Sequence, residues 1–162
     1  MNMRPRIRSE VICYVMAGLS RDASRFVRFK YAGDRSRRRG VIEDLARRVW
    51  KRRKKRNTSR SLLITPKYIW DLAEVAVDEA NSDGMCGRCN GKGWLDTGLK
   101  RIDCFSCFGS GRRKTGDIAI ARKLGVGLDF YRLEGKSIME RHMLGILASY
   151  EGDLYNAFRE RL

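Results

Sequence analysis

Two copies of one short cysteine and glycine pattern constrain the fold of this chain more than any other feature. The pattern Cys-x-x-Cys-x-Gly-x-Gly occupies residues 86–93 and returns at residues 104–111. Two intervening residues let both thiolates of a pair reach one ion, at about 2.3 Å for Zn²⁺. Four thiolates complete a tetrahedron and leave no position for a catalytic water. The sequence therefore predicts a closed, structural Zn²⁺ site whose ligands are Cys86, Cys89, Cys104 and Cys107.

Other uses of paired cysteines fit this sequence less well. Disulfides are disfavoured because the basic start of the chain lacks the layout of an export signal. A redox Cys-x-x-Cys needs one copy rather than two, whereas an iron–sulfur cluster would use the same four ligands. Glycines after each pair free the backbone, so that its amides can turn toward the sulfurs. Residues 93–103 are expected to form a hairpin that turns at Asp96-Thr97-Gly98, and Cys13 to be a small buried residue.

The charge of the chain is unevenly distributed. The 162 residues include 35 Lys or Arg and 19 Asp or Glu, which gives a net charge of +16. Residues 1–60 hold 20 basic against 5 acidic residues, whereas residues 61–162 hold 15 against 14. The strongly basic segment 1–60 favours a nucleic-acid or nucleoprotein partner, because Lys and Arg displace counterions condensed on phosphates. An anionic membrane surface is the alternative. No apolar run approaches the roughly 20 residues of a membrane span, so a soluble, cytosolic protein is expected.

Apolar residues recur at helical spacing along most of the chain. Helices are expected from Ser9, from Ser20 or Ser24, over residues 41–56, after Thr65-Pro66, and finally from about Ile138 to Arg161. The predicted fold is mainly α: one helical domain with a helix-turn-helix-like pair and an inserted zinc-binding hairpin that supplies four cysteine ligands. We divide the chain into a basic N-terminal helical region (1–83), the zinc-binding loop (84–113), and a helix-turn-helix-like and C-terminal helical part (114–162).

Eight basic residues of the N-terminal region are candidates for phosphate binding. Compensation of a helix dipole, about 0.3–1 kcal/mol per cation, accounts for only one or two of the six adjacent cations at residues 51–56. A phosphate backbone would neutralise the others. The candidates are Arg37, Arg38, Arg39, Arg52, Arg53, Lys54, Lys55 and Arg56. Nearby aromatic residues could stack on bases, although burial in the core is the favoured interpretation; they are Phe26, Phe29 and Tyr31.

A second candidate for DNA contact follows the cysteine loop. Gly125 can supply the tight turn of a helix-turn-helix, with small Ala121 where the two helices pack. Gly127 and Glu134 depart from the usual pattern. The second helix would present Asp129, Arg132 and Lys136 to the major groove, with Arg122 and Lys123 beside them. His142 has no catalytic neighbour, and no nucleophile–base pair, carboxylate dyad or Walker loop is found, so no enzymatic activity is expected.

The cysteine loop followed at once by "IARKLGV" and Tyr131 resembles the layout of the late-gene antitermination proteins, Q type, of lambdoid bacteriophages. The resemblance covers roughly residues 84 to 145. Co-chaperones of the DnaJ type share the tandem pattern, but they carry four copies and a J-domain His-Pro-Asp triplet that this chain lacks.

The resemblance implies a function and its partners. A protein of this family recognises double-stranded DNA near a late promoter and joins host bacterial RNA polymerase, held with its sigma factor at a pause. The polymerase then reads through pauses and terminators, in the cytoplasm of the bacterial host. The basic segment would also attract nascent RNA. The alternatives are a zinc-stabilised DNA-binding regulator that acts at an operator, and a zinc-dependent protein-interaction module.

Overall fold

The computed structural model describes residues 14–55, 64–82, 84–98, 100–107, 111 and 115–161, with Lys55 by its backbone alone. Residues 14–16 form a helical turn. The elements that follow are α2 (Arg21–Tyr31), η1 (Arg35–Arg37), α3 (Arg38–Lys55), α4 (Pro66–Asn81), β1 (Trp94–Asp96), β2 (Arg101–Asp103), α5 (Asp117–Leu124), α6 (Leu128–Phe130), η2 (Tyr131–Gly135), η3 (Ile138–Leu144) and α7 (Gly145–Arg161). The mainly helical fold with a small two-stranded hairpin is thus confirmed.

Two helix starts follow directly from capping side chains. Ser20, rather than Ser24, caps α2, because its hydroxyl accepts a hydrogen bond from the Ala23 amide at 3.3 Å. Thr65 caps α4 by accepting from the Tyr68 amide at 3.1 Å, and Pro66 occupies the first turn. The predicted helix start at Ser9 and the side chain of Cys13 lie outside the described residues.

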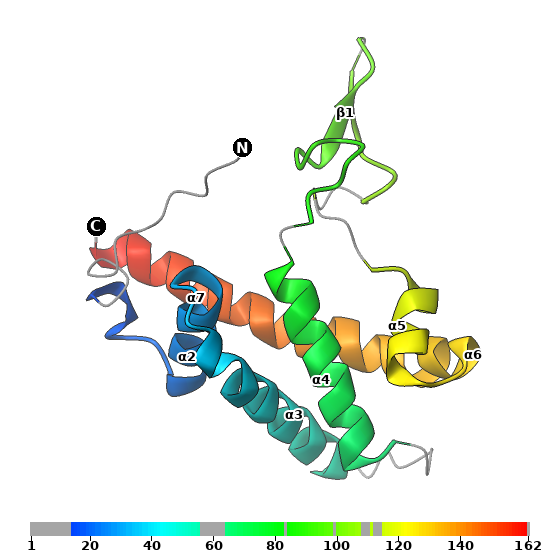
Figure 1. The fold of residues 1–162 in the computed structure, drawn as a ribbon. Helices are drawn as coiled ribbons and strands as arrows, with labels where there is room; N and C mark the ends of the chain where they lie inside the picture. The colour runs from blue at the N-terminus through cyan, green and yellow to red at the C-terminus, as the bar shows by residue number, and fades with distance from the viewer. Residues whose placement is uncertain are drawn as a thin grey trace.

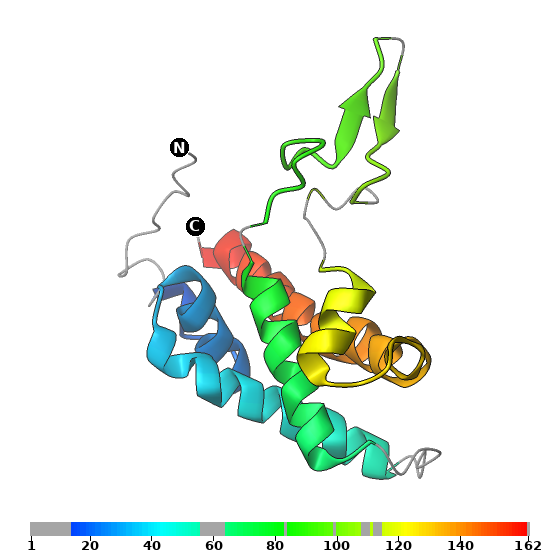
Figure 2. The same ribbon diagram turned by 45° about the vertical axis from the view of Figure 1, so that its right-hand side comes forward.

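The helices on both sides of the cysteine loop share one core. α3 packs along α4, α4 packs against η3, and α2 packs against α7 (Figures 1 and 2). Phe26 and Phe29 are buried in this core, at 0% and 6% exposure, which excludes them as stacking platforms for bases. The favoured interpretation is therefore confirmed for these two residues, but it is wrong for Tyr31, which is 39% exposed.

One long helix replaces the two that the sequence predicts after Gly125. The chain is helical without a break from α6 through η2 and η3 to the end of α7, including π-type turns, so the expected start near Ile138 is wrong (Figure 1). Gly135 does not end the helix but allows close packing in it. A Cβ atom at this position would lie 2.3 Å from the hydroxyl oxygen of Tyr68.

The cysteine loop stands off the helical core. β1 and β2 pair antiparallel with Leu95 opposite Ile102, and the chain turns between Thr97 and Lys100. Figures 1 and 2 show this hairpin projecting away from the helices, beyond the ends of α4 and α5. None of the helices in the described ranges is long and apolar enough to cross a membrane.

Candidate metal centre and nucleic-acid interface

The four predicted ligands form one buried cluster. Cys86, Cys89, Cys104 and Cys107 are each no more than 4% exposed, and their sulfur atoms all lie within 4.8 Å of one another. The Sγ atoms of Cys86 and Cys104 are 3.9 Å apart, and those of Cys89 and Cys107 are 3.7 Å apart. A tetrahedron with bonds of 2.3 Å has edges of about 3.8 Å. The sulfurs therefore have the spacing of four ligands around a single tetrahedral metal ion. None of the four cysteines forms a disulfide.

The two Cys-x-x-Cys-x-Gly-x-Gly segments, which we call the first knuckle (residues 86–93) and the second knuckle (residues 104–111), are joined by matching backbone hydrogen bonds. The Cys86 amide donates to the Gly111 carbonyl at 2.9 Å, and the Cys104 amide donates to the Gly93 carbonyl at 2.8 Å. The first cysteine of each knuckle is thus bonded to the last glycine of the other knuckle. This reciprocity explains why the pattern is repeated, because the last glycine of each copy accepts a hydrogen bond from the first cysteine of the other copy.

Glycine amides point at two of the sulfurs, as the sequence predicts. The Gly93 amide donates to Sγ of Cys89 and the Gly111 amide to Sγ of Cys107, both at 3.3 Å. Such donors offset the negative charge of a coordinated thiolate. Gly111 has a φ of +69°, and a Cβ atom there would lie 2.3 Å from the carbonyl oxygen of Gly91. Only glycine fits this position.

The surroundings of Cys86 and Cys107 shift the pKa values of their thiols in opposite directions. Backbone amides of Cys89 and Arg88 lower the pKa of the Cys86 thiol to about 7. Burial raises the pKa of the Cys107 thiol to about 11. A cation among four sulfurs would favour the thiolate form at every ligand, so metal binding would release protons.

The candidate phosphate-binding residues do not form one continuous patch. Arg38 begins α3 and Arg52 lies near its end, so about 20 Å of helix axis separates the two groups at 1.5 Å per residue. Arg37 pairs with Asp34, whereas Arg39 is exposed. Arg56 and the side chain of Lys55 lie outside the described part of the chain.

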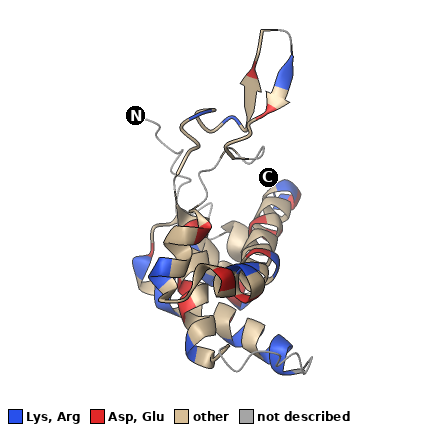
Figure 3. Cartoon of the chain, turned by 90° about the vertical axis from the view of Figure 1, so that its right-hand side faces the viewer, with Lys and Arg blue, Asp and Glu red and all other residues tan. Residues whose placement is uncertain are grey.

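The cations at the far end of α3 match the first group in exposure. Arg52 and Lys54 are exposed there, and Arg53 is half-buried. Figure 3 shows basic residues on this end of the body and again on the hairpin, which lies at the opposite end. We call residues 51–54 the α3 basic end.

Asp78 binds two of the predicted nucleic-acid contacts within the body. Arg38 pairs with Asp78 at 2.7 Å and with Glu74 at 2.9 Å, and Lys123 pairs with Asp78 at 2.8 Å. Burial raises the pKa of the Asp78 carboxyl, but hydrogen bonds from Lys123 and Arg38 outweigh it and hold the pKa below its usual value. These two cations thus join α3 and α5 to α4.

Asp117 binds two more of the predicted contacts. Arg132 Nε and Lys136 Nζ both donate to Oδ2 of Asp117, at 3.3 Å and 3.0 Å. The Lys136 ammonium, with the Arg132 guanidinium, keeps the pKa of the Asp117 carboxyl below its ordinary value. The cations that the second helix was expected to present to DNA are therefore already paired with an acid at the start of α5.

The glycine-linked helix pair itself has the expected local structure. Gly125 adopts a left-handed conformation with a φ of +66°, and Ala121 is 3% exposed. Leu124 and Val126 pack against the core from partly buried positions. Asp129, by contrast, is exposed, as is Arg122.

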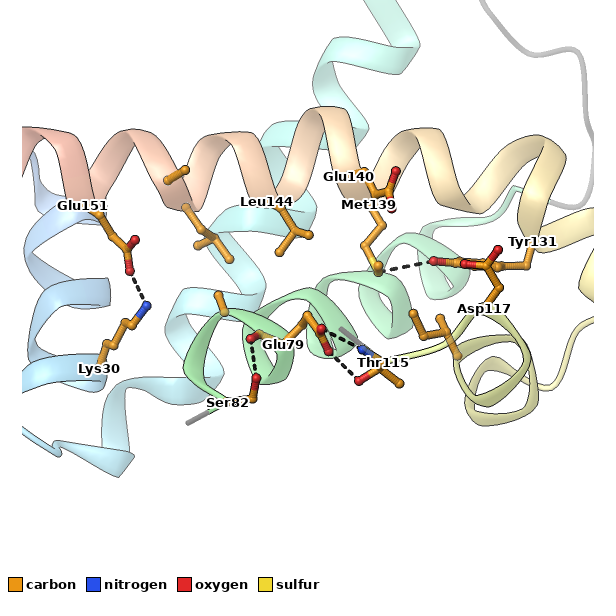
Figure 4. Close-up of a pocket in the computed structure, with 14 residues that line it drawn as sticks. Lys30, Glu79, Ser82, Thr115, Asp117, Tyr131, Met139, Glu140, Leu144 and Glu151 are labelled. Atoms are coloured by element: carbon orange, nitrogen blue, oxygen red, sulfur yellow. Dashed lines mark hydrogen bonds and ion pairs between the residues drawn. The ribbon is translucent and has the colours of Figure 1, made fainter. Parts of the chain in front are cut away.

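A cavity of about 220 Å³ lies between α2, the C-terminal end of α4, α5 and the long helix (Figure 4). Apolar side chains share its lining with four carboxylates and one amine, namely Glu79, Asp117, Glu140, Glu151 and Lys30. The excess of acidic groups makes this face unsuitable for phosphate. One carboxylate joins the two ends of the loop: Glu79 accepts hydrogen bonds from the Thr115 amide at 2.9 Å and from its hydroxyl at 2.5 Å.

Comparison with protein-family models, curated proteins and solved structures found no match to this chain.

Several contacts had no signal in the sequence. The partners of Asp117 lie 15 and 19 residues away, and Glu79 and Thr115 are 36 residues apart. Cation–aromatic pairs on the cysteine loop were missed as well, although its Arg and aromatic residues are plain in the sequence.

Proposed function

We propose that this protein is a bacteriophage transcription antitermination factor of the Q type. It binds double-stranded DNA near a late promoter, loads onto paused host RNA polymerase with its sigma factor, and makes the enzyme read through pauses and terminators. The observation that carries the proposal is the order of two features along the chain. A four-cysteine cluster is followed directly by a helix pair joined at Gly125, which is the layout behind the family resemblance.

The proposed metal is Zn²⁺, in a structural role. Four thiolates in a tetrahedron favour Zn²⁺ or iron among the common metals. The sulfur–sulfur distances of 3.7 Å and 3.9 Å suit one ion, whereas a cluster of several irons spreads its thiolates more widely. Elemental analysis of the purified protein distinguishes zinc from iron. One equivalent of iron would overturn this assignment.

DNA contact is proposed at the helix pair. Arg132 and Lys136 lie one turn apart on the long helix and share the Asp117 carboxylate. Phosphate oxygens are anionic acceptors of the same kind and can take the place of this carboxylate. Asp129 and Arg122 are exposed nearby for contacts to base edges.

The α3 basic end supplies a second, sequence-independent contact. Replacing Arg52, Arg53 and Lys54 together by Gln should lower the slope of log K against log salt by up to about 0.9 for each lost phosphate contact on duplex DNA. Replacing Arg37 of η1 and Arg39 of α3 by Gln gives a comparison variant that loses two cations near the start of α3. An unchanged slope in the first variant would remove the α3 basic end from the interface.

The direct test is in vitro transcription with purified host polymerase. The template carries a phage late promoter followed by an intrinsic terminator, and a matched template lacks the promoter-proximal element. Read-through that requires both the protein and the element would support antitermination. Selective binding to the element with unchanged termination would favour the operator-binding regulator instead.

A further inference from the structure

The metal module, residues 84–111, has no described residue in the helical core. Its buried cluster contains the four cysteines with Leu95 packed against them, and none of these residues belongs to the core formed by the helices. Figures 1, 2 and 3 all show the module extending from the body. A projecting unit whose flanking segments are joined by Glu79 and Thr115 is suited to present its own surface to a partner.

That surface carries aromatic rings paired with cations. The guanidinium carbon of Arg88 lies 3.9 Å from the centre of the Phe105 ring, and the Phe105 side chain is 53% exposed. Arg88 belongs to the first knuckle and Phe105 to the second, so the folded cluster brings them together. Such pairs combine a flat apolar face with a positive charge.

The hairpin carries a second pair of the same kind. The guanidinium carbon of Arg101 lies 4.2 Å from the centre of the Trp94 ring, and Lys92 Nζ lies 5.3 Å from it. Trp94 pairs with Asp103 across the hairpin, which places Arg101 diagonally opposite on the same face. Leu95 faces the other way and packs against the cysteines. The hairpin therefore has an inner face, where Leu95 contacts the cysteines, and an outer face, which carries Trp94 and Arg101.

We propose that the outer surface of the metal module binds single-stranded nucleic acid, with bases stacked on Phe105 and Trp94 and phosphates held by the adjacent cations. Stacking requires an exposed base face, which a duplex hides and a single strand offers. Residues 84–111 hold four Lys or Arg against two Asp, so the module also attracts phosphate. Two acidic residues, Asp96 and Asp103, lie among these cations. The Asp96 carboxylate accepts a hydrogen bond from the Gly98 amide at 3.0 Å within the turn of the hairpin.

The surface differs in kind from the proposed duplex contacts. Those contacts lie on helices and use cations without exposed rings, whereas both described rings of the metal module, Phe105 and Trp94, are paired with cations. An acidic protein partner would also use the cations, but successive bases of a single strand offer each ring a flat face to stack on. The observations thus favour a nucleic acid with accessible bases.

The test measures binding of the full-length protein to labelled oligo(dT), oligo(rU) and a duplex, each of about twelve nucleotides or base pairs, by fluorescence anisotropy. Phe105→Ala should weaken both single-stranded probes roughly tenfold and leave the duplex unchanged. Phe105→Leu, which keeps apolar bulk at this site, should show the same loss, and Phe105→Tyr should restore binding. Tyr155→Ala, which removes a 66% exposed ring from α7, is the matched control and should bind as the wild type does.

Metal content is measured on every variant, so that loss of the cluster is not mistaken for loss of stacking. The proposal is overturned if Phe105→Leu keeps its metal and binds both single strands within about twofold of the wild type. That outcome would indicate that this surface binds a protein instead of a nucleic acid. A stronger loss on oligo(rU) than on oligo(dT) would identify RNA as the natural strand. Read-through and duplex binding are assayed separately, so the antitermination proposal can stand or fall independently.

Discussion

Removal of one cysteine should release the metal but spare the helices. Cys104 is fully buried, and its sulfur lies 3.9 Å from that of Cys86, close to the tetrahedral edge of about 3.8 Å. The Cys104→Ser substitution replaces one of four thiolates by a hydroxyl, which is a poor ligand for zinc. The helical core should tolerate this change, because it and the cysteine cluster have no described residue in common.

The expected size of the effect follows from the geometry. Structural zinc sites contribute about 10–16 kcal/mol at neutral pH. If the four sulfurs share this equally, one missing thiolate costs about 3 kcal/mol or more, which is at least roughly a hundredfold in metal affinity. The melting of the helices should change by no more than about 0.5 kcal/mol, as for a substitution remote from the core.

Two measurements separate these effects. Competition with a chromogenic chelator reports metal affinity, and thermal melting followed by circular dichroism reports the helices. Ser106→Ala, an exposed substitution in the same knuckle, is the matched control and should retain the metal. Full metal occupancy and unchanged chelator resistance in Cys104→Ser would refute the ligand assignment. Collapse of the helical transition would instead refute the separation of the module from the body.

Two further perturbations follow from the structure. Asp117→Asn should release Arg132 and Lys136 and raise duplex affinity a few-fold in a filter-binding assay, because an exposed pair is worth about 0.2–1 kcal/mol; unchanged or weaker binding would argue against these two cations as contacts. The pKa of the folded Asp117 carboxyl is lowered, so its stabilising effect is present above the ordinary carboxyl pKa and is lost as the pH falls through the lowered value. Acid titration of unfolding should therefore show a smaller loss of stability in Asp117→Asn. Gly111→Ala places a Cβ atom 2.3 Å from the Gly91 carbonyl oxygen at a φ of +69°, and should cost about 2 kcal/mol or more in the metal module, seen as faster proteolysis of the loop; wild-type resistance to proteolysis would contradict the close approach.

Local features of the fold could be predicted because their causes are local. Ser20 and Thr65 cap the helices that follow them, and Gly125 takes the left-handed conformation that a tight turn requires. Each of these outcomes depends on a few neighbouring residues. The fusion of α6 and α7 into one helix could not be predicted from local signals, because Gly135 lies inside it at a close approach to Tyr68, 67 residues earlier in the chain.

The clustering of the four cysteines was determined by the sequence itself, since two residues between the cysteines of each pair let both sulfurs reach one site. The glycines after each pair likewise determined that amides would face the sulfurs. Only the tertiary structure decided how the charges are used. Asp78 and Asp117 pair with cations that are distant in sequence, and folding alone brings them within reach. The position of the metal module outside the core was also decided at this level, because it depends on which surfaces the helices bury against one another.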